Sequence, residues 1–376
     1  MTEHTSHRQT PPFRADHVGS LLRPRNLLEA RAGNTEGRVS DDELRQIEDD
    51  AIRDAVRMQE DIGLQSATDG EFRRSSWHMD FIYQLAGITR TQDEMKVTFH
   101  NEEGDLEFTP AAHRVDGKIG LQHTIFGEAF EFLRDTVSTA TPKLTIPSPS
   151  MVHYRGGRAS INPEVYPDID EFWTDLSRAY AEEIRRLADL GCTYLQLDDT
   201  SLAYLNDPKQ REMLDERGEN GGGLHVRYIR QLNASLAGRP EGMRITTHMC
   251  RGNFRSSWVA EGGYDFVADE LFNTLNVDGF FLEFDDARSG GFAPLRFVPE
   301  GKYVVLGLVT TKKGDLENKD DLKRRIDEAS KYVPLEQICL APQCGFSSTL
   351  EGNNLTRDEQ IAKLRLIVET ANEVWG

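Results

Sequence analysis

Short runs of apolar and β-branched residues alternate along the chain with longer stretches in which apolar residues recur every three or four positions. The first pattern is typical of buried strands and the second of amphipathic helices. We predict eight strands, at Phe13–Gly19, Gln65–Gly70, Leu144–Pro147, Thr193–Asp198, Arg244–Met249, Gly279–Phe284, Tyr303–Val309 and Gln337–Pro342. Eight strands separated by helices predict an α/β fold of the (β/α)8 TIM barrel type.

Helical patterns fill most intervals between these strands. Ser40-Asp-Asp-Glu43 has the spacing of a capping box, which should open a helix reaching about Ile62. A second long amphipathic helix is expected over Ile169–Leu190, before Gly191. Further helices are predicted at Tyr228–Ala237, Asp315–Lys331 and Thr356–Val374.

One interval departs from the repeat. Residues 85 to about 140 separate the second strand from the third and are too many for a simple crossover. Within them, Lys96–His100 and Asp105–Thr109 flank Asn101–Gly104 in the pattern of a β-hairpin. We predict a hairpin-containing insertion on one catalytic barrel spanning residues 13–376, preceded by a flexible arm at residues 1–12.

Composition narrows the class of partner. The formal net charge is −19, whereas nucleic-acid binding needs clustered Lys and Arg, so we expect no nucleic acid. No apolar run is long enough to span a bilayer, and the first residues lack the apolar segment of a secretory signal. We therefore expect a cytoplasmic protein without a membrane partner. The chain has four cysteines, too few for a disulfide framework, so a cysteine beside polar residues favours metal binding or catalysis.

Polar side chains gather where the predicted strands end. In a TIM barrel the carboxyl ends of the strands carry the catalytic groups, because the connecting loops meet there. The polar residues at these ends are His17, Ser20, Asp69, Glu71, Asp198, Asp199, His248, Cys250, Glu283, Lys312, Lys313 and Cys344. This distribution predicts one catalytic site at the mouth of the barrel.

His248 and Cys250 stand two apart, which on an extended backbone places both side chains on one face. Imidazole and thiolate are ligands that Zn²⁺ prefers, and a catalytic zinc usually keeps one coordination position open. The alternative is a chance pairing of a buried thiol with a structural histidine. Cys344 follows the last strand, and Glu283 is a carboxylate within an apolar strand, where burial is costly without a cation or strong donors. Together these four residues predict a zinc site.

The order His248-x-Cys250, then a strand Glu283, then Cys344-Gly345 resembles the catalytic barrel of cobalamin-independent methionine synthase. The resemblance is closer still to the single-barrel relatives of that enzyme, and it covers the chain from about Phe13 to the C-terminus. It implies that the four residues bind Zn²⁺. It also implies an enzyme that transfers a methyl group to the sulfur of homocysteine and so makes methionine.

Three further motifs are similar to those of the family. Val18-Gly-Ser20 implies a serine that meets the carboxylate of the amino-acid substrate, and we place His17 in the same substrate site. Asp69-Gly-Glu71 and Gln196-Leu-Asp-Asp199 imply that Glu71 and Asp198 bind the homocysteine ammonium, and Asp198 is also a catalytic candidate. The alternative is that these carboxylates are structural and pair with Arg73 or Arg74.

Two positions depart from the family pattern. Pro149 stands where the family has a tryptophan thought to face the pterin. Lys312 stands where a histidine is implicated in proton delivery to the leaving folate nitrogen, and it is our second catalytic candidate. The chain also has no room for the second barrel that helps two-barrel members hold folate. These departures leave the alkyl donor open.

The chemistry follows from the metal. A free thiol has a pKa of about 8.5 and is mostly protonated at neutral pH, whereas coordination to zinc removes the proton and keeps the sulfur nucleophilic. The thiol would take the open position or displace Glu283. Three functions remain: methylation of homocysteine by a folate or another carrier, alkylation of another thiol, such as epoxide opening by coenzyme M, and a non-catalytic metal- or ligand-binding barrel. A sulfonate-bearing thiol would need cations at the barrel mouth, for which the candidates are Arg14, Arg73, Arg74, Arg155 and Arg158; the family resemblance implies that these could equally bind a folate glutamate tail. A homo-oligomer is compatible with the sequence.

Overall fold

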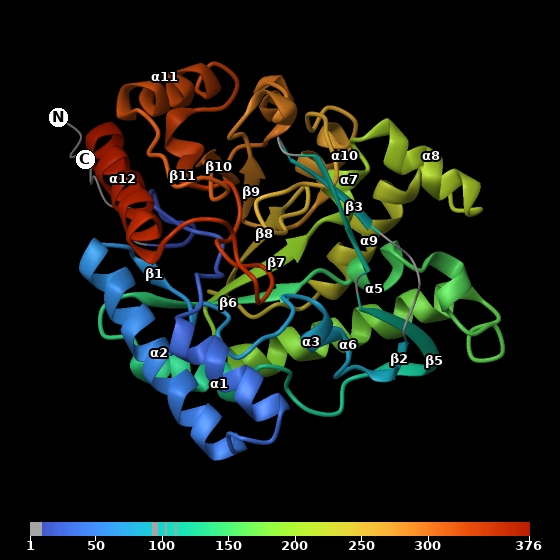
Figure 1. Ribbon diagram of the computed structural model, residues 1–376. Helices are drawn as coiled ribbons and strands as arrows, with labels where there is room; N and C mark the ends of the chain where they lie inside the picture. Colours follow the sequence, from blue (N-terminus) through green and yellow to red (C-terminus); the bar gives the residue numbers. More distant parts are fainter. Residues whose placement is uncertain (1–9, 92–96, 102–103, 110) are drawn as a thin grey trace.

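The computed structural model describes residues 10–91, 97–101, 104–109 and 111–376. Its central sheet has seven parallel strands in the order β1-β6-β7-β8-β9-β10-β11. Their bounds are Ser66–Ala67 (β1), Thr141–Pro147 (β6), Tyr194–Asp199 (β7), Arg244–Met249 (β8), Gly279–Glu283 (β9), Tyr303–Val309 (β10) and Ile338–Pro342 (β11). The strands curve around the centre with helices outside (Figure 1). This is an α/β fold with a parallel half-barrel sheet, consistent with a TIM-like barrel.

The first predicted strand, Phe13–Gly19, is not a regular strand. One bridge to Leu340 of β11 joins it to the sheet. The physical cause is the side chain of Asp16, whose carboxylate accepts hydrogen bonds from the N–H groups of Phe13 at 3.1 Å and His17 at 2.8 Å. These N–H groups therefore do not enter a ladder with a neighbouring strand.

The other seven predicted strands are present, and β8 and β10 have the predicted bounds. β1 is shorter than predicted and pairs with β6 over two residues. In the register of β7 and β8, Asp198 lies opposite His248. The sheet therefore places one predicted substrate residue beside one predicted metal ligand.

The long predicted helices are present as α2 (Asp41–Ile62) and α6 (Ile169–Asp189). The Ser40 hydroxyl accepts a hydrogen bond from the Glu43 N–H at 3.2 Å, which is one half of the predicted capping box. The other predicted helices are α9 (Leu224–Ser235), α11 (Lys319–Ala329) and α12 (Arg357–Trp375). The prediction omitted α1 (Arg25–Thr35), α3 (Met79–Ile82), α4 (Gly127–Thr136), α5 (Met151–Tyr154), α7 (Ser201–Tyr204), α8 (Pro208–Glu216) and α10 (Ala268–Thr274).

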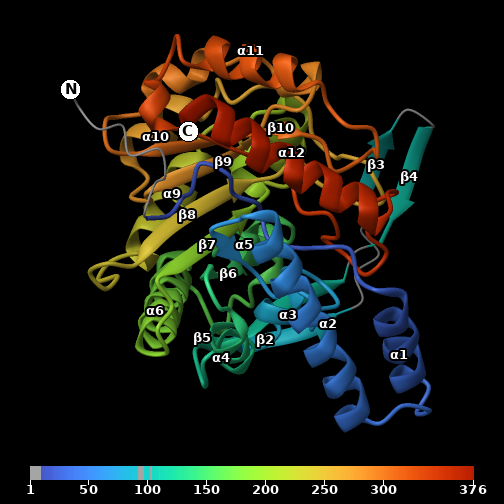
Figure 2. The ribbon, with the colours of Figure 1, turned by 90° about the vertical axis from the view of Figure 1, so that its left-hand side faces the viewer.

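Between β1 and β6 the chain forms two antiparallel pairs, β2 (Ala86–Thr91) with β5 (Ala112–Gly120) and β3 (Val97–Asn101) with β4 (Gly104–Phe108). The second pair is the predicted hairpin, of which Lys96 and residues 102–103 lie outside the described residues. Figure 2 shows β3 and β4 at the rim of the molecule. His100 of β3 bridges Trp258 in the loop after β8, so the hairpin lies against that loop.

A buried ion pair lies inside the barrel. Lys143 of β6 places its Nζ 3.3 Å from an oxygen of Asp16, and both side chains are fully buried. Asp16 also accepts hydrogen bonds from Ser66 at 2.9 Å and Tyr194 at 2.8 Å. Because these partners satisfy both carboxylate oxygens, the charge is tolerated in the interior.

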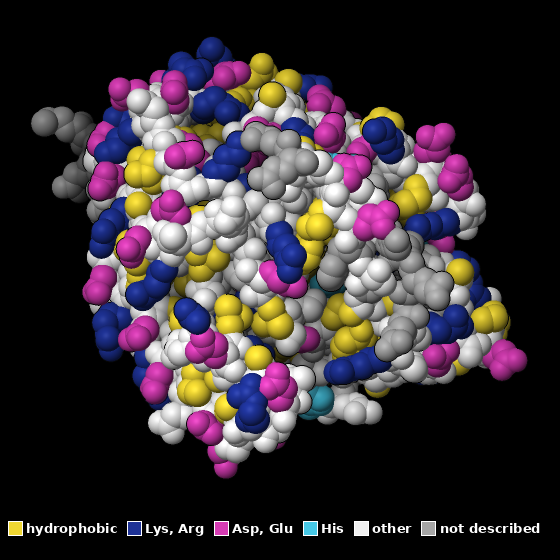
Figure 3. Space-filling model, in the orientation of Figure 1, with side chains coloured by type: hydrophobic (Ala, Val, Ile, Leu, Met, Phe, Trp, Pro, Cys, Tyr) yellow, Lys and Arg dark blue, Asp and Glu magenta, His cyan; other side chains and the backbone are white. Residues whose placement is uncertain are grey.

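The surface shows acidic and basic side chains interspersed over the face seen in Figure 1 (Figure 3). Within the described ranges, no helix combines the length and the apolar character needed to cross a bilayer. Most of the predicted arm, residues 1–9, lies outside the described residues.

Candidate metal centre and substrate cavity

Three side chains meet at the carboxyl edge of the sheet. His248 lies in β8, Cys250 directly follows β8, and Cys344 follows β11. Their ligand atoms all lie within 4.8 Å of one another, and the two sulfur atoms are 3.2 Å apart. All three residues are buried. The strand order therefore brings together residues that are 94 positions apart in the chain.

This donor set fits Zn²⁺. Both ring nitrogens of His248 are buried without a hydrogen-bond partner of good geometry among the described residues. A buried polar atom left unbound is costly, so the imidazole is suited to a ligand. A hydrogen bond from Cys250 lowers the pKa of Cys344 well below its ordinary value, which favours a thiolate there. One imidazole and two cysteine sulfurs are ligands that zinc prefers.

Glu283 lies at the end of β9, beside the three-residue cluster and not among its close ligand atoms. Its side chain is fully buried. One carboxylate oxygen accepts a hydrogen bond from the Arg251 N–H at 3.0 Å, and the other accepts from Gln343 Nε2 at 3.2 Å. Because Arg251 follows Cys250 and Gln343 precedes Cys344, the carboxylate holds both cysteine-bearing loops.

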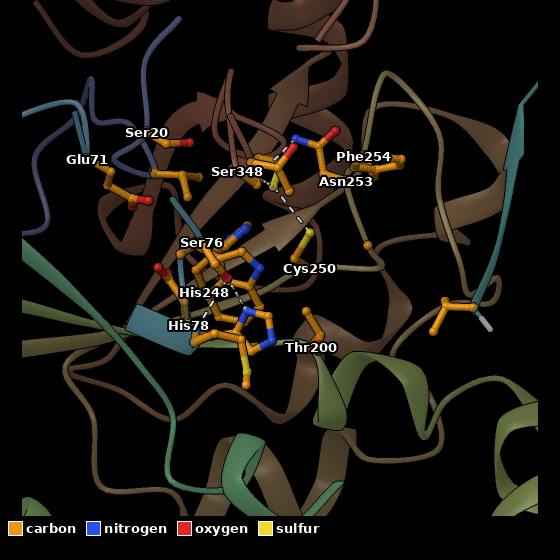
Figure 4. Close-up of a pocket in the computed structure, with 18 of the residues that line it drawn as sticks. Ser20, Glu71, Ser76, His78, Thr200, His248, Cys250, Asn253, Phe254 and Ser348 are labelled. Carbon is orange, nitrogen blue, oxygen red and sulfur yellow. Dashed lines mark hydrogen bonds between the residues drawn. The ribbon is translucent and has the colours of Figure 1, made fainter. Parts of the chain in front are cut away.

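A cavity of about 220 Å³ opens onto the cluster (Figure 4). Its lining includes the three cluster residues together with Ser20, Glu71 and Asp198. One oxygen of Glu71 accepts a hydrogen bond from Thr145 Oγ1 at 2.9 Å, and the other is buried without a partner among the described residues. Burial raises the pKa of Asp198 to about 7. The cavity thus combines sulfur and imidazole ligands with carboxylates suited to an ammonium group.

The comparisons with known proteins agree with this arrangement. The family model described as "Cobalamin-independent synthase, Catalytic domain" matches residues 155–373. The chain is 46% identical over 370 residues to the uncharacterised protein YxjG of Bacillus subtilis, with 98% of this chain and 96% of that protein covered. The chain belongs to the cobalamin-independent methionine synthase family.

Two further members of the cobalamin-independent methionine synthase family are similar to the chain. A crystal structure of a putative vitamin-B12-independent methionine synthase from Listeria monocytogenes is 36% identical, with a TM-score of 0.78, and the match covers 98% of this chain and 100% of that one. A methionine synthase of Pyrococcus abyssi is 25% identical over 331 residues, covering 88% of this chain and 85% of that protein. The matched family region contains the four predicted metal ligands.

Ser20 reaches the cavity through a close approach between two loops. A Cβ atom on Gly345 would lie 2.0 Å from the Ser20 hydroxyl oxygen, so only glycine fits beside it. The same hydroxyl accepts a hydrogen bond from the Ser347 N–H at 3.3 Å. The Cys-Gly pair after β11, part of the family pattern, therefore links the metal cluster to the predicted substrate serine.

Two predicted site residues lie outside the cavity wall. His17 is buried, its carbonyl oxygen accepts a hydrogen bond from Lys143, and burial lowers its pKa to about 4. Lys312 directs its ammonium to Asp285, with 3.1 Å between Nζ and the carboxylate. Neither residue is therefore part of the cavity lining, and their contacts are with Lys143 and Asp285.

The arginines proposed as partners of the substrate carboxylates differ in placement. Arg73 pairs with Glu48 at 3.1 Å and Asp49 at 2.5 Å, away from Glu71. Arg74 lies 3.8 Å from Glu71, but its guanidinium donates hydrogen bonds to the side chain and carbonyl of Thr145. Glu71 therefore keeps one unpartnered oxygen beside the cavity.

Several cavity residues were absent from the sequence prediction. They are Trp77, His78, Phe99, Tyr204 and Phe254, whereas Arg155 was predicted as a candidate cation at the barrel mouth. Most lie in loops or in short helices, where no hydrophobic periodicity marks them. One signal was available: Ser75-Ser-Trp-His78 lies three residues beyond the Asp69-Gly-Glu71 motif, in the loop after a predicted strand.

Proposed function

We propose that this protein is a zinc-dependent S-alkyltransferase that methylates homocysteine to methionine. One observation carries the proposal: the His248, Cys250 and Cys344 cluster shares a cavity with Glu71 and Asp198. The first group suits a metal that activates sulfur, and the second suits the ammonium of an amino acid. We assign this activity to a single barrel over residues 13–376, with residues 85 to about 140 as an insertion.

The amino-acid end of the substrate is assigned to Ser20, Glu71 and Asp198. The Ser20 hydroxyl would donate a hydrogen bond to the carboxylate, while the unpartnered oxygen of Glu71 would accept one from the ammonium. Charged hydrogen bonds of this kind are short and strong. With its polar end held there, homocysteine can direct its side chain toward the sulfur atoms of Cys250 and Cys344.

Zinc bound by His248, Cys250 and Cys344 would supply the Lewis acidity that lowers the pKa of the substrate thiol. We assign Glu283 as an exchangeable fourth ligand. The surrounding residues hold the geometry: Arg251 and Gln343 orient Glu283, and the buried walls exclude water. The substrate sulfur then forms its new bond to the methyl carbon as the bond from that carbon to the donor breaks.

Asp198, Lys312 and His17 take different parts in this proposal. Asp198 contacts the ammonium and is the catalytic carboxylate at the cavity. Lys312 is best assigned as a positioning residue, because its ammonium binds Asp285. Burial raises the pKa of the nearby Glu283 carboxyl, and the charge of Lys312 opposes this rise. His17 supports the strand-end loop that carries Ser20.

The other two functions find less support. A sulfonate-bearing thiol such as coenzyme M would bring its negative charge to the carboxylates of Glu71 and Asp198, which favour a cation. A non-catalytic binding barrel has no need for a buried sulfur and imidazole cluster that faces a substrate cavity. Methylation of homocysteine uses both features.

The test is metal content together with product formation. The purified protein should hold about one zinc per chain and form methionine from homocysteine when supplied with a methyl donor, either 5-methyltetrahydropteroyl glutamates or methylcobalamin. Cys344→Ser should lose both zinc and activity. Cys192→Ser, which changes a buried thiol outside the cluster, is the matched control and should keep both. Full activity in the metal-free protein would refute the proposal.

A further inference from the structure

The loop after β8 carries one of the cysteines of the metal cluster and contains a strained turn. This β8 loop, residues 250–260, begins at Cys250 and reverses direction at Arg255 and Ser256. The two residues at the turn have φ of +48° and +64°, in the left-handed region, although neither is glycine. Such a backbone conformation is costly and persists only where the surrounding structure holds it.

Two segments that are distant in the sequence hold the β8 loop. On one side, the His100 N–H of β3 donates to the Trp258 carbonyl oxygen at 2.6 Å, and the Trp258 N–H donates to the His100 carbonyl oxygen at 2.9 Å. On the other side, the side chain of Asn353, in the loop that follows Cys344, accepts from the Ser256 N–H at 3.0 Å. The β8 loop is therefore held between the inserted hairpin and the loop of the second cysteine.

The hairpin also forms part of the wall of the metal cavity. Phe99 is buried in β3, and its ring packs on the ring of Phe254 in the β8 loop, with 5.2 Å between the centroids. Both rings line the cavity at the metal cluster. In Figure 4 Phe254 lies on the opposite side of Cys250 from Glu71. The hairpin and the β8 loop thus build an apolar wall that faces away from the carboxylate end of the cavity.

Trp258 extends this contact toward the proposed fourth metal ligand. The Cζ atom of Arg288 lies 4.5 Å from the centroid of the Trp258 ring. Arg288 and Lys312 lie 3.9 and 3.1 Å from the carboxylate of Asp285. Asp285 is two residues beyond Glu283, in the loop after β9. The residue that pairs with the hairpin therefore also packs against the charged groups beside Glu283.

We propose that the β3–β4 hairpin is a positioning element of the active site: through Phe99 and the His100–Trp258 pair it holds the β8 loop in the conformation in which the metal cluster binds the substrate thiol. The inference rests on the proposed function, because thiol binding at the metal is the step that the hairpin supports. Phe99 and Phe254 place apolar surface beside the cluster. Water excluded by this surface would otherwise weaken the attraction between a metal cation and a thiolate.

The test measures thiol binding separately from metal content. In the Phe99→Ala variant we expect about one zinc per chain but a homocysteine dissociation constant that is higher by roughly ten- to a hundredfold, the range for groups around metal ligands. Calorimetry with the zinc-loaded protein measures this constant. With Co²⁺ in place of zinc, the absorption spectrum of the bound metal should also change, because it reports the geometry of the ligands. Phe99→Leu, which keeps an apolar side chain against Phe254, should restore both.

Phe132→Ala is the matched control, because Phe132 is a half-buried residue of α4 that does not line the cavity. It should bind homocysteine as the unchanged protein does. If Phe99→Ala does not fold, Asn101→Ala takes its place, since it removes the hydrogen bond from Asn101 Nδ2 to Ser257 Oγ at 3.0 Å and loosens the same contact.

A folded hairpin variant that binds homocysteine as tightly as the unchanged protein, with the same cobalt spectrum, would overturn the inference. Equal losses in Phe99→Ala and Phe132→Ala would also overturn it, because the effect would then not depend on contact with the β8 loop. Failure of the unchanged, zinc-loaded protein to bind homocysteine would instead contradict the proposed function.

Discussion

The carboxylate of Glu283 accepts a hydrogen bond from the main-chain N–H of Arg251 at 3.0 Å, directly beside Cys250. Its other oxygen binds Gln343, the residue before Cys344. One buried carboxylate therefore fixes the backbone on the flank of each cysteine. As the proposed fourth ligand, Glu283 would be pre-oriented by these neighbours, as is common for metal sites whose surrounding hydrogen bonds set the ligand geometry.

Glu283→Gln tests this relationship. The amide oxygen can still accept from the Arg251 N–H, so the Cys250 loop should keep its position, whereas the amide nitrogen cannot accept from Gln343 Nε2, so the contact to the Cys344 loop and the negative charge are lost. We expect zinc to remain at about one per chain, with affinity lower by roughly tenfold or more, as for other changes around metal ligands. Competition with a chelator measures this. Affinity equal to that of the unchanged protein would show that Glu283 only positions the loops.

Glu71→Gln tests the ammonium site. Glutamine can still accept from Thr145, but it loses the charge of the unpartnered oxygen. The KM for homocysteine should rise roughly tenfold or more, which is the range for a lost charged hydrogen bond, and zinc content should not change. The matched control is 4-mercaptobutyrate, a thiol acid without the ammonium group. If the variant weakens both thiols equally, Glu71 does not bind the ammonium.

Gly19→Ala should disturb the same site through the backbone. Gly19 has φ of +149°, and an added Cβ would lie 2.8 Å from the Thr145 methyl group, whose hydroxyl binds Glu71. We expect a loss of about 1–3 kcal/mol in unfolding free energy, measured with denaturant, and a higher KM for homocysteine. Gly238→Ala is the control, because Gly238 has φ of +81° and open space around it. This variant measures the cost of backbone strain without a steric clash. Equal effects of the two variants on KM would contradict this account.

We expect the free energy of unfolding to depend on pH through Glu183. It is buried in α6, one oxygen accepts from the Ile125 N–H at 3.1 Å, and the other has no partner among the described residues. Burial raises its pKa from 4.5 to about 8. Because the folded pKa lies above the unfolded one, folding favours the protonated form, and stability falls as pH rises from 4.5 to 8.

Glu183→Gln keeps the hydrogen-bond acceptor and removes the titration. The variant should therefore be more stable than the unchanged protein at pH 8. The gain in unfolding free energy should not exceed about 1.4 kcal/mol for each unit of pKa shift. The difference should shrink toward zero near pH 4.5. Thermal unfolding across this range measures it, and a stability difference that does not vary with pH would contradict the assigned cause.

The sequence predicted the strands where apolar runs are flanked by polar residues. β8 and β10 have the predicted bounds because Arg244–Met249 and Tyr303–Val309 are bounded by loop residues on both sides. Phe13–Gly19 has a similar apolar pattern, yet the Asp16 carboxylate takes two of its N–H groups. Side-chain to backbone hydrogen bonds of this kind leave no trace in hydrophobic periodicity.

The residues of the candidate site also fall into two groups, those that the sequence could predict and those that it could not. His248, Cys250 and Cys344 could be predicted because each has distinctive ligand chemistry at a strand end. Arg155 was predicted as a candidate cation at the mouth, whereas His78 and Phe254 could not be predicted, because loop conformation brings them to the cavity. Lys312 stands at a predicted strand end, but a salt bridge with Asp285 directs its side chain away from the cavity. The sequence therefore predicts which strand-end loop carries a polar residue. The hydrogen-bond and ion-pair partners of that residue decide whether its side chain points into the cavity.

The most direct test of the central claim is whether a substrate thiol binds the metal. With Co²⁺ in place of zinc, a sulfur-to-cobalt absorption band reports each bound thiolate. The account predicts that homocysteine increases this band saturably with release of one proton per chain, that homoserine does not, and that Cys344→Ser abolishes the metal site. Methionine formation without any change in the band on homocysteine binding would contradict it.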